Sequence, residues 1–187
     1  MQNRPDFYYI PTGLDKTMAY HIMGLVERDF LHDGEIDEGN IDKSIRNCKT
    51  GWIPHTHWIS GMMAHYIKES NQKFFKYDLT GWANDIQYTE YNKKGSHYGW
   101  HCDIGIVNLL NGCESRKLSI SLLLSDPSEY EGGEFQLLLD GRKDMITLKP
   151  PLGYAIIFPS TSVHRVRPIK SGVRTSLVGW YGGPNFR

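Results

Sequence analysis

The chain has 187 residues, of which 40% are apolar and 22% charged, as expected for one soluble globular domain. Basic and acidic residues number 21 each, and this zero net charge argues against a protein that binds nucleic acid. No apolar stretch is long enough to span a bilayer. The first residues have no basic region followed by an apolar run, so we expect no secretory signal. Three cysteines are too few for a disulfide framework. We therefore expect a cytoplasmic protein without a membrane segment.

Two segments among the first eighty residues have helical spacing. In residues 14–31 the apolar side chains recur three or four positions apart, and Asp15 stands where it can cap the helix. Residues 57–75 show a weaker form of the same pattern. The polar stretch 32–40 between them predicts a surface loop.

From about residue 81 the pattern changes to short strand-like runs separated by glycine and proline turns. Asp140-Gly141, between two alternating runs, is a good hairpin signal. The predicted strands are 86–91, 98–104, 118–124, 134–139, 145–148, 154–158, 163–167 and 174–180. This order predicts one domain over 1–187, with a helical support over about 1–80 and a β sandwich or barrel over about 81–187.

Three side chains in the strand region have the chemistry of a metal site. On a strand, His101 and Asp103 point to one face and Cys102 to the other, where we expect a small core residue. His164 begins a later strand that we expect across the barrel from this pair. Alone, His101 is more simply a histidine hydrogen-bonded to the neighbouring Asp103, and His164 is more simply a loop histidine. Together, two histidines and one carboxylate leave coordination positions open, as non-haem Fe(II) requires.

Arg174 and Ser176 share one face of the last predicted strand. A guanidinium group matches a carboxylate with two parallel hydrogen bonds, and a buried arginine in a barrel needs an anionic partner. The distal carboxylate of 2-oxoglutarate would be such a partner. Taken alone, Arg174 is more simply a surface ion pair, but its place after the three candidate ligands indicates a shared site.

The surrounding residues carry a family resemblance. From about residue 41 to 183 the chain resembles the 2-oxoglutarate- and Fe(II)-dependent oxygenases of the prolyl-hydroxylase-like group, which includes prolyl 4-hydroxylases and bacterial PKHD-type hydroxylases. YNKKGSHYGWHCD is similar to the signature of that group, and FPSTSVHRVRPIKSGVRTSLVGW is similar to the end of the PKHD-type proteins. The matched residues are Tyr91, Gly95, Tyr98, His101, Asp103, Gly132, Gly133, Pro159, Ser160, His164, Val166, Gly172, Arg174, Ser176 and Trp180.

The resemblance implies a double-stranded β-helix in which His101, Asp103 and His164 are the iron ligands and catalytic centre. It also implies that Arg174 binds the distal carboxylate of 2-oxoglutarate. The implied cofactors are Fe(II), with 2-oxoglutarate and O₂ as cosubstrates and ascorbate as reductant.

The binding site around these groups departs from the family at one position. Leu123 stands where related prolyl hydroxylases have a tyrosine that assists the arginine. The hydroxyl of Tyr91, that of Ser176, or a water molecule would replace it. Tyr91 matches the family tyrosine that lines the cosubstrate or substrate pocket. Trp180 matches an aromatic residue that forms a wall of the same pocket in the hypoxia-sensing prolyl hydroxylases.

The implied reaction is hydroxylation of an unactivated C–H bond with release of succinate and CO₂. The resemblance favours a proline in a peptide or protein, bound by a monomer or weak dimer. A free amino acid or other small metabolite is the alternative. A nucleic-acid demethylase is disfavoured, because Trp180 stands where those enzymes carry a second arginine. A metal-free jelly-roll binding module would leave the candidate ligands and Arg174 unexplained.

The remaining features concern the surroundings of the site. Residues 104–117 are long for a hairpin loop, and we expect a mobile binding loop or lid over the pocket. Arg116, near its end, is a candidate contact for a peptide carboxylate. His55 and His57 precede a predicted helix and are expected to form local hydrogen bonds only.

Overall fold

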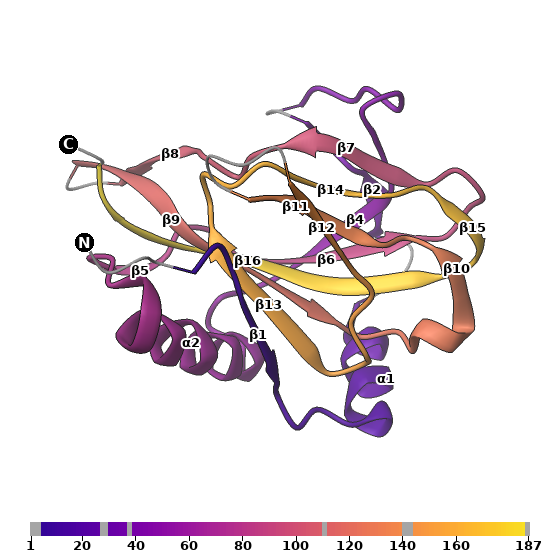
Figure 1. Cartoon of the computed structure of the whole chain (residues 1–187), viewed down its shortest axis with the longest axis horizontal. Coiled ribbons are helices and arrows are strands. Elements are labelled where there is room, and N and C mark those ends of the chain that lie inside the picture. Colours follow the sequence, from indigo (N-terminus) through magenta and orange to yellow (C-terminus); the bar gives the residue numbers. More distant parts are fainter. Residues whose placement is uncertain (1–4, 27–29, 37–38, 110–111, 140–143, 186–187) are drawn as a thin grey trace.

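A computed structural model describes residues 5–26, 30–36, 39–109, 112–139 and 144–185 and shows a mainly β protein (Figure 1). Its helices are α1 (Lys16–Leu25) and α2 (Trp58–Ser70), with a π-helical turn at Asn71–Phe75 and a 3₁₀ turn at Pro127–Glu129. The strands of the first half are β1 (Tyr8–Pro11), β2 (His32–Asp33), β3 (Arg46–Asn47), β4 (Lys49–Ile53), β5 (Gly81–Trp82), β6 (Ile86–Tyr91) and β7 (His97–His101). Those that follow are β8 (Ile106–Leu109), β9 (Gly112–Leu123), β10 (Tyr130–Gly132), β11 (Phe135–Leu138), β12 (Met145–Leu148), β13 (Tyr154–Pro159), β14 (His164–Val166), β15 (Ile169–Gly172) and β16 (Arg174–Pro184).

The strands form two main sheets whose neighbours are all antiparallel. The larger sheet has the order β1-β13-β9-β16-β6-β4-β2, with β5 added beside β16 and β8 beside β9. The smaller sheet has the order β12-β11-β14-β7-β3, and β10 pairs with β15. This arrangement is the expected double-stranded β-helix, so the predicted fold class is confirmed.

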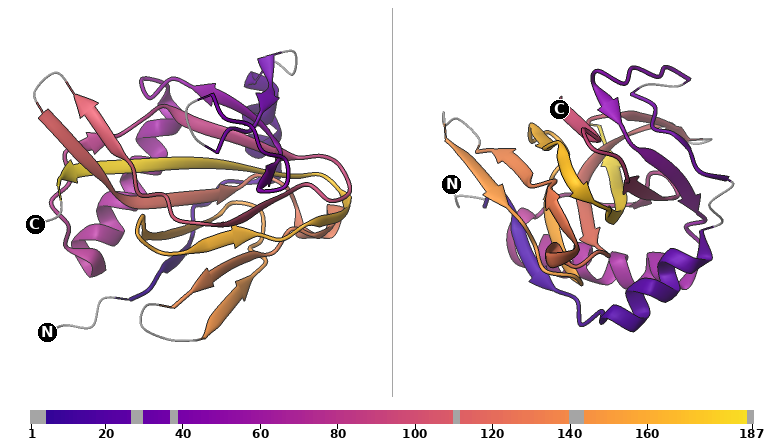
Figure 2. Two further views of the ribbon diagram at one scale, coloured as in Figure 1. Left: turned by 90° about the horizontal axis from the view of Figure 1, so that it is seen from above. Right: turned by 90° about the vertical axis from the view of Figure 1, so that its right-hand side faces the viewer.

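Both helices cover the outer face of the larger sheet, and the right-hand view of Figure 2 shows them on the same side of the strands. Strand alternation produces this layer on β9, where Leu118, Ile120 and Leu122 are fully buried against the helices. The intervening Ser119 and Ser121 face the interior of the β-helix. The outer face is therefore an apolar core, whereas the inner face carries polar groups.

The two predicted helices are present with shorter bounds. Helix α1 begins after Asp15 because the Asp15 carboxylate accepts a hydrogen bond from the Met18 backbone nitrogen at 2.8 Å. The ring of His57 caps α2 by accepting from the Ile59 nitrogen, a local hydrogen bond as expected. His55 differs from the expectation, because its ring pairs with Asp85, which is 30 residues away in the sequence. No helix within the described ranges is both long and apolar enough to cross a membrane.

The prediction of a loop over residues 104–117 is wrong. Strand β8 pairs with the first part of β9, from Ile106 opposite Ser115 to Leu109 opposite Gly112. The segment is therefore a hairpin that extends the larger sheet, because both of its halves pair through their backbones. The predicted Asp140-Gly141 turn lies outside the described residues.

Candidate metal centre and its pocket

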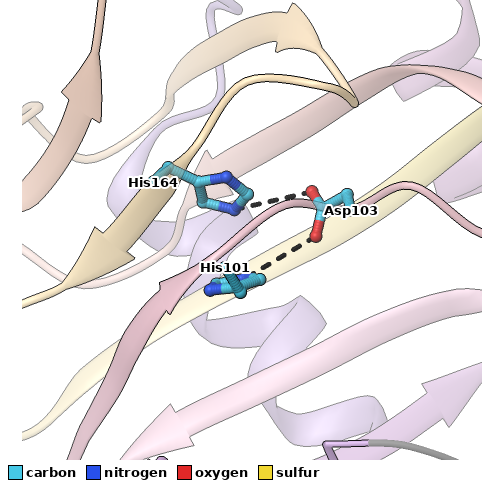
Figure 3. A group of neighbouring side chains, drawn as sticks. All are labelled: His101, Asp103 and His164. Carbon is cyan, nitrogen blue, oxygen red and sulfur yellow. Dashed lines mark ion pairs between the residues drawn. The ribbon is translucent and has the colours of Figure 1, made fainter.

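His101, Asp103 and His164 converge at the interior of the β-helix (Figure 3). His101 ends β7 and His164 begins β14, and the two residues are direct cross-strand partners. They therefore lie on neighbouring strands, not across the barrel as predicted. Asp103 follows β7 and is anchored through its backbone nitrogen, which donates to the Ser160 carbonyl at 2.9 Å.

The donor atoms of the three side chains have the spacing of a metal site. One ligand atom from each residue lies within 4.8 Å of the other two. The Nε2 atoms of His101 and His164 are 3.6 and 3.5 Å from the two carboxylate oxygens of Asp103. Donor atoms bound to one transition-metal ion at about 2 Å have separations of this order.

Backbone carbonyls fix both imidazoles in the orientation that metal binding requires. Nδ1 of His101 lies 2.8 Å from the Gly99 oxygen, and Nδ1 of His164 lies 2.9 Å from the Ser162 oxygen. A carbonyl oxygen only accepts, so each Nδ1 carries the proton in the neutral ring. The lone pair on each Nε2 then points to Asp103, where it is free to bind a cation.

Aromatic rings hold the two histidines in place. The ring of Tyr98 stacks on that of His101, with ring centres 3.5 Å apart. The guanidinium of Arg46 in turn lies 4.5 Å from the ring centre of Tyr98. Phe135 and Phe158 pack against His164 at 5.4 and 4.7 Å. This packing restricts the rings to few orientations.

Electrostatics favour the deprotonated ligands. Burial raises the pKa of the Asp103 carboxyl, but its interactions with His164 and His101 outweigh that effect, and the pKa lies well below its usual range. Burial lowers the pKa of His164 against the opposing effect of Asp103, which keeps the ring neutral. Asp103 Oδ2 is also buried and has no hydrogen-bond partner in the part of the chain that the structure describes. This donor set fits a divalent ion, and two histidines with one carboxylate suit Fe(II).

Arg174 is 2% exposed and enters the same cavity as the three candidate ligands. Its Nη1 donates to Ser176 Oγ at 3.2 Å, and its guanidinium lies 5.4 Å from the ring centre of Tyr91. No ion pair joins it to a carboxylate in the described part of the chain, and its Nε has no hydrogen-bond partner there. A buried cation in this state favours an anionic ligand.

Tyr130 is a neighbour of Arg174 that the sequence did not single out. Among the described residues its buried hydroxyl has no hydrogen-bond partner. Burial raises the pKa of this hydroxyl, and the nearby positive charge of Arg174 opposes that effect. Gly133 (φ +66°) allows this packing, because a Cβ atom there would lie 3.0 Å from Arg174 Cδ and 3.3 Å from Tyr130 Cε2. In the sequence, the two glycines that follow it in Tyr130-x-Gly132-Gly133, just before β11, are the local feature that marks Tyr130 as a candidate.

The cavity at this site has a volume of about 770 Å³ and is lined by every predicted site residue. Leu123, the residue that departs from the family pattern, lies opposite Ser176 in the β9–β16 register. The wall beyond the candidate ligands includes Trp180 and Arg116, whose guanidinium lies 4.1 Å from the Trp180 ring centre. The ring of Trp52, which is half exposed, has its centre 6.4 Å from that of Trp180.

Two further residues differ from the sequence predictions or were missed. Cys102 is exposed and is not a core residue, because β7 ends at His101 and the strand alternation ends with it. Arg46 is buried beside the cavity and bonds only to neutral acceptors, including Gln87 Oε1 at 2.6 Å. The polar segment around Arg46 gave no periodic signal that would have placed it inside.

Comparison with known proteins agrees with this geometry. Residues 86–182 match the family model of the 2OG-Fe(II) oxygenase superfamily. A PKHD-type hydroxylase of Synechococcus sp. (strain CC9902) is 47% identical over 87 residues, which are 46% of this chain and 36% of that protein. A PKHD-type hydroxylase of Aliarcobacter butzleri (strain RM4018) is 29% identical over 177 residues, which are 92% of this chain and 76% of that protein.

Solved structures share the fold over most of the chain. A Trichoplax adhaerens prolyl hydroxylase in complex with a hypoxia-inducible-factor peptide fragment has a TM-score of 0.76 at 19% identity and covers 94% of this chain and 83% of its own. A Pseudomonas putida prolyl-4-hydroxylase has a TM-score of 0.75 at 19% identity, and the match covers 96% of this chain and 93% of that protein. Because the family model spans more than half of the sequence, this chain belongs to the 2OG-Fe(II) oxygenase superfamily.

Proposed function

We propose that this protein is an Fe(II)- and 2-oxoglutarate-dependent dioxygenase that hydroxylates a proline in a peptide or protein. The observation that carries the proposal is one cavity that holds three convergent ligand atoms and a buried, unpaired arginine. The superfamily implies Fe(II), 2-oxoglutarate and O₂. The net reaction consumes one molecule each of 2-oxoglutarate, O₂ and substrate and yields succinate, CO₂ and the hydroxylated product.

His101, Asp103 and His164 would hold the iron on one side and leave its other positions to ligands. When bound, the iron supplies the O₂-dependent oxidation, and the protein supplies position and exclusion of water. The carbonyls of Gly99 and Ser162 keep the histidine rings in the binding tautomer. No side chain of the site has to act as a nucleophile or general base in this proposal.

Arg174 would bind the distal carboxylate of 2-oxoglutarate through a charge-assisted pair of hydrogen bonds. Ser176 already accepts from Nη1 and thereby fixes the plane of the guanidinium. Tyr91 packs beneath the same group with its hydroxyl pKa raised by burial, so it stays neutral beside the cosubstrate. These contacts would replace the tyrosine hydroxyl that is missing at position 123, where this chain has Leu123.

Two observations support a peptide substrate. Several neighbours in fold are prolyl hydroxylases, and the structure of one of them contains a bound peptide fragment. The wall formed by Trp180 and Trp52 continues from the candidate iron site to a half-exposed indole, which suits a chain that extends out of the cavity.

The test is a succinate-release assay with Fe(II), 2-oxoglutarate and a panel of proline-containing peptides, followed by mass spectrometry. We expect a gain of one oxygen on proline that depends on both cosubstrates and is lost in His101→Ala. Hydroxylation of free amino acids but of no peptide would replace the peptide substrate with a small metabolite. No consumption of 2-oxoglutarate in the presence of any substrate would contradict the proposed activity.

A further inference from the structure

Arg116 has an unusual environment on the substrate side of the cavity. It belongs to β9, its backbone nitrogen donates to the Gly105 carbonyl two residues after Asp103, and its side chain lines the cavity wall. One face of the guanidinium lies 4.1 Å from the Trp180 ring centre. The side chain is therefore held flat beside the candidate metal centre.

The hydrogen bonds of this side chain leave part of the guanidinium available. Nε and Nη2 both donate to the amide oxygen of Asn84, at 3.0 and 2.6 Å. Across the described ranges no hydrogen bond from Nη1 and no ion pair to a carboxylate is formed. The hydrogen-bond acceptor of the partly buried Arg116 is neutral, and the negative charge that acts on it is that of Asp103, a candidate ligand whose charge a bound metal ion would offset. This arrangement favours an added anion.

The charges of the loaded site would not compensate Arg116. The two charges of Fe(II) and that of Arg174 balance those of Asp103 and the two carboxylates of 2-oxoglutarate. Of the other acids along the cavity, Asp33 is paired with Lys43 and Lys49, each at 3.0 Å. The single charge of the exposed Glu35 is matched by that of Arg46, which donates to the Glu35 carbonyl. The substrate part of the cavity is therefore left positive.

Arg46 is the other buried cation of this wall, but it is less available than Arg116. Its three nitrogen atoms all donate, to Cys48 Sγ, to the Glu35 carbonyl and to Gln87 Oε1. It is 7% exposed, and its guanidinium packs on Tyr98. Arg46 therefore joins the two sheets, whereas Arg116 has a free Nη1 at the cavity wall.

We propose that the substrate carries a carboxylate next to the residue that is hydroxylated, and that Arg116, supported by Trp180 and Asn84, binds it. This inference deepens the proposed function and rests on it. An acidic side chain beside the target proline and the carboxylate of a chain that ends at this point offer the same chemistry. Either would pair with Nη1 while the indole of Trp180 covers the face of the guanidinium.

The experiment compares two matched pairs of fluorescent peptides. One pair has Asp or Asn beside the proline, and the other ends after the proline as a free carboxylate or as an amide. Binding is measured by anisotropy with Mn(II) and 2-oxoglutarate in the absence of O₂, so that the readout does not depend on turnover. The proteins compared are the unchanged chain, Arg116→Gln, Arg116→Lys and the control Arg165→Gln, in which an arginine stacked on Trp100 outside the cavity is removed.

We expect the acidic member of one pair to bind about tenfold more tightly to the unchanged chain and to the control. The pair that shows the effect identifies the source of the carboxylate. The preference should vanish in Arg116→Gln and be partly retained in Arg116→Lys, since a point charge replaces a planar fork. Equal binding within both pairs, no binding of either pair, or a preference that survives in Arg116→Gln would overturn the inference.

The outcome is separate from that of the proposed function. Equal binding and equal oxygen gain on acidic and neutral peptides would remove the carboxylate subsite and leave the hydroxylase. An Arg116-dependent preference for the acidic peptide without any consumption of 2-oxoglutarate would keep the subsite and contradict the hydroxylase.

Discussion

His101 and His164 are direct partners on two neighbouring antiparallel strands, and their ring centres lie 4.2 Å apart. The pairing of β7 with β14 therefore brings two histidines from distant parts of the sequence to one point. Asp103 completes the group because the chain turns inward after β7 and its nitrogen is held by Ser160. The position of the candidate metal centre thus follows from backbone pairing.

Replacing His101 or Asp103 by alanine should abolish Fe(II) or Mn(II) binding while the thermal unfolding transition is retained. Each change removes one of three ligands, and neither side chain belongs to the apolar clusters. Metal content by mass spectrometry and Mn(II) resonance spectra measure the effect. His97→Ala is the matched control. His97 lies on the same strand as His101, but its ring bonds to the Gly95 and Ser44 carbonyls. Full metal content in His101→Ala would contradict the ligand assignment.

Arg174→Leu should raise the KM for 2-oxoglutarate at least tenfold, because it removes a charge-assisted contact worth about 2–5 kcal/mol from a desolvated carboxylate. Metal binding should stay close to that of the unchanged chain. Arg174→Lys should lie between the two, since ammonium cannot form the planar pair of hydrogen bonds. Steady-state succinate release at varied 2-oxoglutarate measures the change. An unchanged KM in Arg174→Leu would show that the carboxylate binds elsewhere.

Tyr130→Phe should raise the KM for 2-oxoglutarate about fivefold, equivalent to about 1 kcal/mol, with kcat nearly unchanged. The hydroxyl of Tyr130 and the Nε of Arg174 are both buried without partners, and we expect them to bond when the cosubstrate orients the guanidinium. Tyr20→Phe is the control, because it removes a hydroxyl that bonds to Glu129 at the surface. A loss confined to kcat would assign Tyr130 a different role.

Two glycine-to-alanine changes should alter stability in opposite directions. Gly133 has φ +66°, and an added Cβ would lie 2.5 Å from Ile169 Cδ1, so Gly133→Ala should lower the free energy of unfolding by about 1–3 kcal/mol and weaken 2-oxoglutarate binding. Gly61 is inside α2 with no atom within 4 Å of an added Cβ, so Gly61→Ala should raise stability by about 0.5–1 kcal/mol. Chemical denaturation measures both. A stable Gly133→Ala with normal cosubstrate binding would show that this packing has no role.

Local pattern was enough to predict the main elements. The apolar spacing of residues 57–75 and the alternation in 86–91 depend on side chains close in sequence, and both elements are found, as α2 with its π-helical turn and as β6. The strands missed from the sequence, among them β1 and β4, carry no clear alternation and exist because a partner strand supplies their hydrogen bonds. The β8–β9 hairpin was missed for the same reason.

The sequence by itself determined the chemistry of the candidate site, because residue type and order alone identify two histidines, one carboxylate and an arginine with a family resemblance. Tertiary structure decided which groups share a cavity. It placed His164 beside His101, left Cys102 exposed, brought Tyr130 to Arg174, and stacked Arg116 on Trp180 with the neutral Asn84 as its hydrogen-bond acceptor. These relationships depend on strand register and on burial of the guanidinium groups, and both arise only when segments far apart in the chain pack together.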